Sequence, residues 1–253
     1  MLQIVHAPEN KLYEFDMSHL SKPSQSFANS ALVVRAEEAV VSREVAPSFS
    51  FYRAIGKRSF DVLFLLLVLP FVLPVILILA VCVKLDGGPA FYAQRRVGRN
   101  GKIFQFYKLR SMRVNADEFL VKLCQENPEI AAEWETYQKL RHDPRITKVG
   151  HFIRKTSLDE LPQLLNIFKG DMSFVGPRPF MPSQQALYEA ANGSEYFEMR
   201  PGLTGPWQVS GRGESSFVAR VRYDNFYHRK LSLVTDLALI LRTFTVVLKS
   251  SGH

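Results

Sequence analysis

The hydrophobic pattern of the chain is dominated by one apolar run, Val62 to Val83, which contains no charged or polar side chain. A helix of these 22 residues would be about 33 Å long at roughly 1.5 Å per residue, enough for a bilayer core of about 30 Å. Pro70 and Pro74 lie within the run, and each removes a backbone N–H and clashes with the preceding turn. Because they are four residues apart they share a helix face. The pattern therefore predicts a bent element, helix-break-helix.

Basic residues flank the apolar run on both sides, with Lys57 and Arg58 before it and Lys84 after it. Cytoplasmic flanks tend to be basic, so both ends are expected on the cytoplasmic side and the run is predicted to be re-entrant. A kinked helix that crosses the bilayer is the alternative. The predicted membrane anchor comprises Lys57, Arg58, Asp61, Pro70 and Pro74.

The rest of the pattern predicts a mainly helical α+β fold. A small strand hairpin is expected around the turn at Asn100-Gly101. Residues 114–141 are expected to form two helices divided at Pro128, and the C-terminal segment is expected to form another pair divided near residues 231–232. These amphipathic helices fit either packing on the domain or a position in the membrane interface.

Three regions follow from this pattern. Residues 1–50 lack a persistent apolar period and are predicted to be a disordered tail. Residues 51–84 are predicted to form the re-entrant membrane helix with its basic flank, and residues 85–253 are predicted to form a domain at the cytoplasmic face that carries the candidate catalytic residues. No cationic start followed by an apolar core opens the chain, so a cleaved signal peptide is not expected.

The composition of the chain indicates an anionic binding partner. The net charge is +8 and the pI about 9.5. Residues 1–50 hold four Lys or Arg and six Asp or Glu, a net charge of −2, so the remainder carries +10. Two cysteines are too few for a disulfide framework and are expected to be reduced, in a cytoplasmic setting.

Candidate chemistry centres on the adjacent acids Asp159 and Glu160. Ser157 and Glu160 fit a capping box, but Pro162 would then fall inside the helix and remove a backbone bond. Alternatively, the helix begins at Pro162 and the acids lie on an irregular turn before it. A carboxylate beside basic groups stays ionised and is a candidate nucleophile or metal ligand.

Basic residues in several motifs are candidates for binding phosphate. Arg178 lies between two prolines in GPRP, so a stiff loop presents a guanidinium group that matches phosphate bidentately. The turn-rich segment RPGLTGPWQVSGRG offers backbone N–H groups and an aromatic ring. The charges near the hairpin fit a phosphate-binding surface or a solvated face near anionic lipids, and both interpretations stay open. The basic candidates are Arg178, Arg154, Lys108, Arg110, Arg200 and Arg212.

Four motifs in order carry a resemblance to a known family: KRSFD, RRVGRNGKIFQFYKLRSM, RKTSLDELPQLLNIFKGDMSFVGPRP and RPGLTGPWQVSGR. The chain resembles bacterial sugar transferases, the monotopic phosphoglycosyl transferase family. Within it, the chain is most similar to members that start exopolysaccharide synthesis by moving galactose- or glucose-1-phosphate to undecaprenyl phosphate. The resemblance covers the chain from Lys57 onward and leaves out the first fifty residues.

The resemblance implies a UDP-hexose donor, a polyprenyl phosphate acceptor in the membrane, and release of UMP. Asp159 matches the family nucleophile, which forms a phosphosugar-aspartyl intermediate, and Glu160 would position groups or hold Mg²⁺ together with Asp159. Arg178 matches a phosphate-binding position, and Asp224 in YDNFY matches a position linked to the nucleotide. The implied location is the cytoplasmic face of the bacterial inner membrane. The further partners that the resemblance leads us to expect are membrane lipid and downstream glycosyltransferases, and nucleic acid is not expected to be one.

The chain departs from the family in one respect. Many relatives have Ser-Pro at the break of the membrane helix, where this chain has Leu73-Pro74. Two other functions remain as alternatives: a non-catalytic membrane-tethered module that binds nucleic acid or anionic lipid through its basic surface, and, ranked last, an acid-pair glycosidase. No motif distinguishes galactose from glucose.

Overall fold

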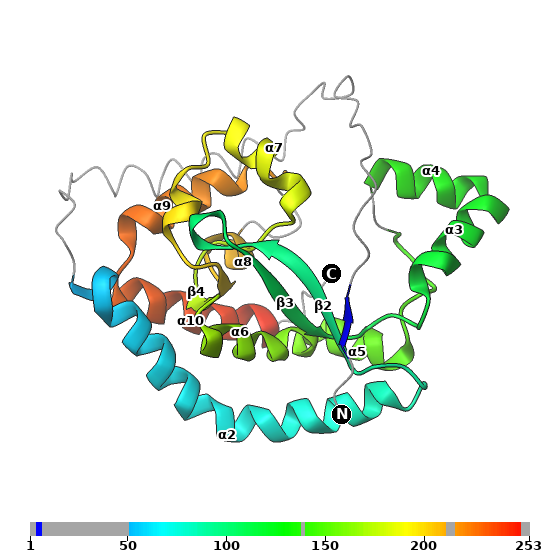
Figure 1. Ribbon diagram of the computed structural model, residues 1–253, viewed down its shortest axis with the longest axis horizontal. Coiled ribbons are helices and arrows are strands. Elements are labelled where there is room, and N and C mark those ends of the chain that lie inside the picture. The colour runs from blue at the N-terminus through cyan, green and yellow to red at the C-terminus, as the bar shows by residue number, and fades with distance from the viewer. Residues whose placement is uncertain (1–3, 7–50, 138–139, 211–215, 249–253) are drawn as a thin grey trace. The chain divides into compact units, whose positions relative to one another are not determined.

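The computed structural model describes residues 4–6, 51–137, 140–210 and 216–248 (Figure 1). Most of the predicted tail and Arg212 therefore lie outside the described residues. The helices are η1 (Tyr52–Gly56), α2 (Lys57–Lys84), η2 (Arg99–Gly101), α3 (Ala116–Glu126), α4 (Pro128–Tyr137), α5 (Lys148–Lys155), η3 (Leu158–Gln163), α6 (Leu164–Lys169), η4 (Pro182–Gln184), α7 (Gln185–Ala190), η5 (Glu195–Glu198), α8 (Pro206–Ser210), α9 (Arg220–Lys230) and α10 (Leu233–Leu248). The strands are β1 (Ile4–His6), β2 (Phe91–Val97), β3 (Ile103–Leu109), β4 (Ser173–Val175) and β5 (Gly202–Thr204). The predicted class, mainly helical α+β, is confirmed.

Two small sheets organise the strands. β1 pairs in parallel with β2, and β2 pairs antiparallel with β3 as the predicted hairpin. The hairpin turns at η2, where Asn100 and Gly101 have φ of 56° and 72°, a left-handed conformation that these two residue types tolerate best. Directly opposed residues of an antiparallel pair point to one face, so the register places Arg96 opposite Phe104 and Lys108 opposite Tyr92 on the same face. β4 and β5 form a separate parallel pair.

The apolar run forms one helix, α2, of 28 residues that contains both prolines (Figure 1). The predicted interruption between two helices is not observed, although Figure 1 shows α2 curving along its length. A proline inside a helix removes only its own backbone bond, so the neighbouring turns can continue the helix through a bend. The re-entrant path of α2 through a membrane stays a prediction.

Hydrogen bonds fasten the N-terminal end of α2 to the rest of the described fold. Lys57 Nζ donates to Asp236 Oδ2 of α10 at 2.6 Å, and Arg58 Nη1 donates to the carbonyl oxygen of Ile167 at 2.6 Å. Asp61 Oδ1 accepts from the hydroxyl of Ser173 at 2.9 Å. The predicted anchor residues Lys57, Arg58 and Asp61 thus bind the helices and strand that follow the hairpin.

The C-terminal end of α2 joins the same body. Arg110 Nη2 donates to the carbonyl oxygen of Val83 at 3.1 Å, and its guanidinium group also pairs with Asp86. Leu79 and Val83 are buried in a cluster that includes Ile153 of α5. Because full burial of one such side chain stabilises by about 1.5–3 kcal/mol, this end is held by packing as well as by hydrogen bonds.

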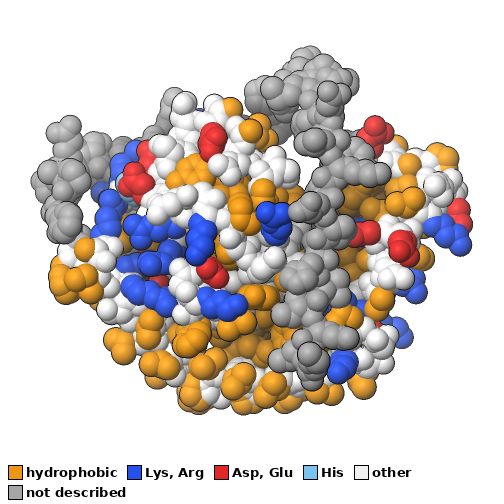
Figure 2. Space-filling view, viewed as in Figure 1, with side chains coloured by type: hydrophobic (Ala, Val, Ile, Leu, Met, Phe, Trp, Pro, Cys, Tyr) orange, Lys and Arg blue, Asp and Glu red, His pale blue; other side chains and the backbone are white. Residues whose placement is uncertain are grey.

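The face of α2 that points away from the core is apolar and exposed. The large exposed side chains of this face include Leu63, Leu66, Leu67, Phe71, Leu73, Leu77, Ile78 and Val81. Figure 2 shows hydrophobic side chains gathered along the lower edge, where α2 lies in Figure 1, with Lys and Arg side chains in a band above them. α2 is long and apolar enough to cross a membrane by length and composition.

The remaining helices follow the predicted divisions in most places. α3 ends just before Pro128 and α4 begins at it, and α9 and α10 are separated at residues 231–232, as predicted. The segment expected to be a turn-rich connection instead contains β5 and α8. A Cβ atom at Gly202 would lie 2.1 Å from the backbone nitrogen of Gly176, so the two glycines permit the close approach of β4 and β5.

Candidate active site

The acid pair lies in a 3₁₀-helix, which neither predicted alternative included. Ser157 has φ of 57° and makes no side-chain cap hydrogen bond, and η3 then carries Asp159, Glu160 and Pro162 before α6 begins at Leu164. The capping box is therefore not formed, and the start of a helix at Pro162 is wrong as well. A short 3₁₀ segment tolerates this arrangement because only a few bonds have to be made. Its first turn presents both carboxylates to β3.

Lys108 of β3 holds the two carboxylates together. Its Nζ donates to Asp159 Oδ2 at 3.2 Å and to Glu160 Oε1 at 2.8 Å. Asp159 is 8% exposed, so its side chain is largely buried. The ammonium group also lies 5.7 Å from the centre of the Phe106 ring, which is two residues away on the same face of the strand. The strand alternation thus aims Lys108 at the acids.

Arg178 binds the same oxygen atom of Glu160 as Lys108 does. Its Nη2 donates to Glu160 Oε1 at 3.2 Å. Burial by itself opposes ionisation of Glu160, but the charges of Lys108 and Arg178 outweigh it and hold the pKa of this carboxyl well below its ordinary range. Glu160 is therefore ionised at neutral pH, and its charge orients both cations.

Two further arginines, absent from the predicted site, join this cluster. Arg96 of β2, the strand paired with that of Lys108, lies 5.4 Å over the ring of Phe106, and its Nη1 donates to the carbonyl oxygen of Pro179 at 3.5 Å. Arg220 of α9 lies 4.0 Å over the ring of Trp207. The period of two along the hairpin places Arg96 on the face of Lys108 once the register is known. No local signal distinguishes Arg220 from the other arginines nearby.

Asp224 lies behind this cluster, buried on α9. Its carboxylate accepts a hydrogen bond from the hydroxyl of Tyr188. Burial raises the pKa of Asp224 to about 7, while the Tyr188 hydrogen bond and the charge of Arg220 act in the opposite direction. Tyr188 and the rings of Phe180 and Tyr196 pack together around it. Asp224 is therefore a buried carboxyl group with a pKa near neutrality. When it is ionised, its negative charge acts on Arg220.

Three predicted phosphate-binding residues are placed away from the acid pair or engaged elsewhere. The guanidinium group of Arg110 donates to Asp86 and to the carbonyl oxygens of Val83, Pro89 and Met112, so it serves the end of α2. Arg200 donates to the carbonyl oxygen of Gly170 at 2.9 Å, and burial together with the charges of Arg99 and Arg58 lowers its pKa. The charge of Arg154 on α5 acts on Asp143.

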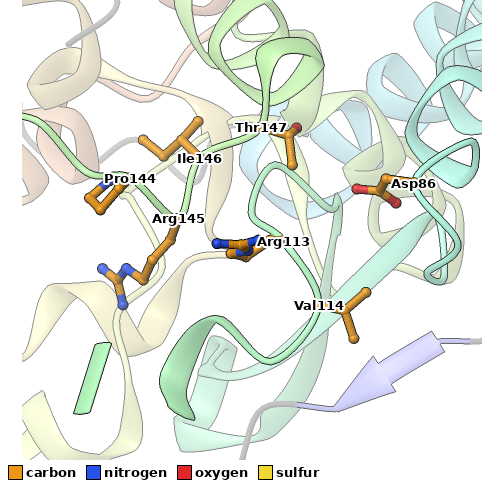
Figure 3. A pocket seen from close by; sticks show the side chains of 7 residues that line it. All are labelled: Asp86, Arg113, Val114, Pro144, Arg145, Ile146 and Thr147. Carbon is orange, nitrogen blue, oxygen red and sulfur yellow. The ribbon is translucent and has the colours of Figure 1, made fainter. Parts of the chain in front are cut away.

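A separate hollow of about 460 Å³ opens on the described surface (Figure 3). Figure 3 shows the side chain of Arg113 pointing into it, with Arg145 and Asp86 at opposite sides. Arg145 is already paired with Asp143, since its Nη2 donates to Asp143 Oδ2 at 2.7 Å. The hollow is not lined by Asp159, Glu160 or Arg178, so the candidate chemistry belongs to the acid cluster instead.

The acid pair fits Mg²⁺ by the chemistry of its donors. Magnesium is commonly bound through one or two carboxylates together with substrate phosphates and water, which is what Asp159 and Glu160 would supply. Among the residues that the structure describes, no group of three or more His, Cys, Asp or Glu side chains gathers to form a complete cage. A metal at this site would therefore depend on the substrate for its remaining ligands.

Comparison with known proteins gives this geometry a context. A model of the family described as bacterial sugar transferase matches residues 52–250. The exopolysaccharide production protein ExoY of Sinorhizobium fredii is 47% identical over 199 residues, which cover 78% of this chain and 88% of that protein.

Two relatives with more specific names are also similar. Undecaprenyl-phosphate galactose phosphotransferase of Salmonella typhimurium is 43% identical over 242 residues, 95% of this chain and 48% of that protein. UDP-glucose:undecaprenyl-phosphate glucose-1-phosphate transferase of Caulobacter vibrioides is 39% identical over 205 residues, 78% of this chain and 71% of that protein. The chain thus spans about half the length of several of the curated relatives it matches.

Proposed function

The chain belongs to the bacterial sugar transferase family, and from this premise we propose that it transfers a hexose-1-phosphate from a UDP-sugar to undecaprenyl phosphate, the first step of an exopolysaccharide or related glycan. The single observation that carries the proposal is the contact of Asp159 and Glu160 with Lys108 and Arg178. Phosphoryl transfer needs charge neutralisation and positioning above all, and this cluster offers both. The names of the relatives, which include galactose and glucose enzymes, support a UDP-hexose donor. They favour it over a non-catalytic binding module.

The proposed reaction has two displacements. A carboxylate oxygen of Asp159 forms a bond to the sugar-bearing phosphorus, and the bond from this phosphorus to the bridging oxygen breaks, with its electron pair leaving on UMP. A phosphate oxygen of undecaprenyl phosphate then attacks the same phosphorus and releases the Asp159 carboxylate. Lys108 neutralises the carboxylates before the donor binds, and Arg178 binds a phosphoryl oxygen.

Mg²⁺ is part of this proposal. Held by Asp159 and Glu160, it would neutralise charge on the diphosphate of the donor. Lys108 lies between the two carboxylates and would have to shift its hydrogen bonds when a cation and a diphosphate arrive. Lys108 then becomes available to the phosphoryl oxygens.

We further propose that α2 lies in one leaflet, with the described body at the cytoplasmic face of the membrane. Both ends of α2 are hydrogen-bonded to one body, through Lys57 at one end and Val83 at the other. A helix of 28 residues is about 42 Å long, so a straight span would place its ends on opposite sides of the bilayer. The exposed apolar side chains of Phe152 on α5 and Phe168 on α6, helices that contact α2, support an interfacial position.

Release of UMP from a panel of UDP-sugars, with undecaprenyl phosphate in detergent, tests the proposed activity. Asp159→Asn keeps the size and the hydrogen-bonding oxygen of the side chain but removes the nucleophilic charge, so turnover should fall below detection. Rapid quench of the wild-type chain with UDP-sugar alone should trap a phosphosugar adduct on Asp159 by mass spectrometry. Near-normal turnover by Asp159→Asn would refute the nucleophile, and no adduct together with full turnover would favour direct transfer.

A further inference from the structure

Three guanidinium groups from distant parts of the chain lie close to one another, and one of them, Arg178, is bonded to Glu160. Arg96 comes from β2, Arg178 from the loop after β4, and Arg220 from α9. Burial and the neighbouring charge of Arg178 lower the pKa of Arg96 to about 10 and that of Arg220 to about 10. Like charges collected in a partly dry environment repel one another, so the arrangement favours an anion that neutralises all three.

Two buried donors in this cluster have no partner in the described part of the chain. The Nε atoms of Arg96 and Arg220 are both buried and make no hydrogen bond there. Such groups are rare in folded proteins, because leaving a buried donor unpaired is costly. The face of the Arg220 guanidinium is occupied by Trp207 at 4.0 Å and by Phe217 at 5.0 Å, so only its edge is available for hydrogen bonds. A guanidinium edge matches the oxygens of a phosphate.

Ion pairs also connect these groups in order. Asp159 bonds to Lys108, Lys108 to Glu160, and Glu160 to Arg178. Arg96 lies beside the loop of Arg178, since its Nη1 donates to the carbonyl oxygen of Pro179, and the charge of Arg178 acts on both Arg96 and Arg220. The two orphaned donors therefore belong to groups near Arg178, which the ion pairs connect to Asp159 through Glu160 and Lys108.

This order matters for an in-line displacement. The attacking and leaving oxygens lie on opposite sides of the phosphorus, so the leaving group points away from the nucleophile. With Asp159 attacking the sugar-bearing phosphorus, the phosphate of the leaving UMP points away from Asp159, whereas Arg96 and Arg220 lie near Arg178 and not in the ion pair of Asp159 with Lys108.

We propose that Arg96 and Arg220 bind the phosphate of the leaving nucleoside monophosphate, and that Arg178 bridges this phosphate and the transferred phosphoryl group. The inference rests on the proposed function and assigns two binding residues to it. When the bond between the sugar-bearing phosphorus and the bridging oxygen breaks, the electron pair stays on the UMP phosphate, whose added negative charge the two guanidinium groups neutralise without any proton transfer.

The charge of the cluster agrees with this assignment. Four cations face two carboxylates, an excess of two positive charges: Lys108, Arg96, Arg178 and Arg220 against Asp159 and Glu160. The diphosphate of a UDP-sugar is doubly negative, so this excess attracts it, and the Mg²⁺ proposed at Asp159 and Glu160 would add further positive charge. Asp224, with a pKa of about 7, lies behind Arg220 and lessens the excess when it is ionised.

Binding of UMP to the full chain in detergent micelles tests the proposal without turnover. Titration calorimetry measures the Kd, and the fluorescence of Trp207 beside Arg220 provides a second signal. Arg96→Gln and Arg220→Gln should each raise the Kd for UMP about 10-fold or more, since each loses a charge-assisted hydrogen bond. Binding of uridine, which lacks the phosphate, should not change. Arg222→Gln, on the same helix but exposed, is the matched control and should bind UMP like the wild type.

The outcomes separate the inference from the function on which it rests. Wild-type chain that neither binds UMP nor releases it from any UDP-sugar would refute the proposed function itself. Wild-type binding and turnover, combined with unchanged UMP affinity in Arg96→Gln and Arg220→Gln, would overturn the inference alone. If a Gln variant lowers the Tm markedly, the corresponding Arg→Lys variant is tested instead. It keeps the positive charge but loses the planar guanidinium group that binds phosphate through two hydrogen bonds. Its UMP affinity should still fall about fivefold, with uridine binding intact, and unchanged affinity would again count against the proposal.

Discussion

Removal of Lys57 should loosen the attachment of α2 to the rest of the protein. Asp236 of α10 is fully buried and accepts hydrogen bonds from Lys57 Nζ, Tyr52 Oη and Tyr227 Oη, each at 2.6 Å. Lys57 is the one cation among these three partners. Lys57→Met keeps the length of the side chain but leaves the Asp236 charge buried without a counter-ion.

The expected magnitude follows from this geometry. Breaking a buried ion pair from one side typically costs about 3–5 kcal/mol. Because the two tyrosine hydroxyls still donate to Asp236, the lower end of this range, about 3 kcal/mol, is expected. For a domain of this size 1 kcal/mol corresponds to roughly 2–4 °C, so the Tm should fall by roughly 6–12 °C.

Thermal unfolding of the purified chain in detergent, followed by circular dichroism, measures this loss. Lys84→Met at the exposed other end of α2 is the matched control and should change the Tm little. The double variant Lys57→Met with Asp236→Asn removes the stranded charge and should recover some of the lost stability. A Tm for Lys57→Met equal to that of Lys84→Met would show that the pair does not hold the helix.

Three further outcomes follow from the structure. Lys108→Met should lower the UMP-release rate about 100-fold. Because Lys108 is the largest of the charges that lower the pKa of Glu160, the acid limb of the pH–rate profile should also move to higher pH, whereas Lys108→Arg should keep it low. Burial raises the pKa of Asp224 from 3.8 to about 7, so the folded state binds its proton more tightly than the unfolded state does. Stability to urea should therefore fall between about pH 4 and pH 7, by a few kcal/mol at about 1.4 kcal/mol per unit, and Asp224→Asn should flatten this fall. Gly202→Ala should lower the Tm by the equivalent of about 1–3 kcal/mol or more, since its Cβ atom would lie 2.1 Å from a backbone nitrogen; an unchanged Tm would contradict the tight β4–β5 contact.

The local features of the chain could be predicted from the sequence. The apolar run, the hairpin turn at Asn100-Gly101 and the helix boundary at Pro128 each depend on a few neighbouring residues, and all three have counterparts in the structure. The acid pair and the order of the four motifs were equally visible, which is why the family could be inferred before any geometry was known. Backbone propensities and turn chemistry act over such short distances.

The 3₁₀ conformation around Asp159 could not be predicted in the same way. Both sequence-based alternatives assumed an α-helix, one from Ser157 and one from Pro162. The observed segment instead packs against β3, where Lys108 meets both acids. This contact joins residues 51 and 52 positions apart, and tertiary packing decides between local conformations whose free energies are close.

The sequence alone determined which residue types the protein carries and which short elements they form: an apolar helix, an acid pair and a surplus of arginines. Only the tertiary structure decided which arginine faces which group. It places Arg178 on Glu160 but engages Arg110 at the end of α2, and it adds Arg96 and Arg220 to the cluster. The physical reason is that a guanidinium group acts over a few ångströms, whereas the segments that supply these groups meet only after the strands and helices have packed.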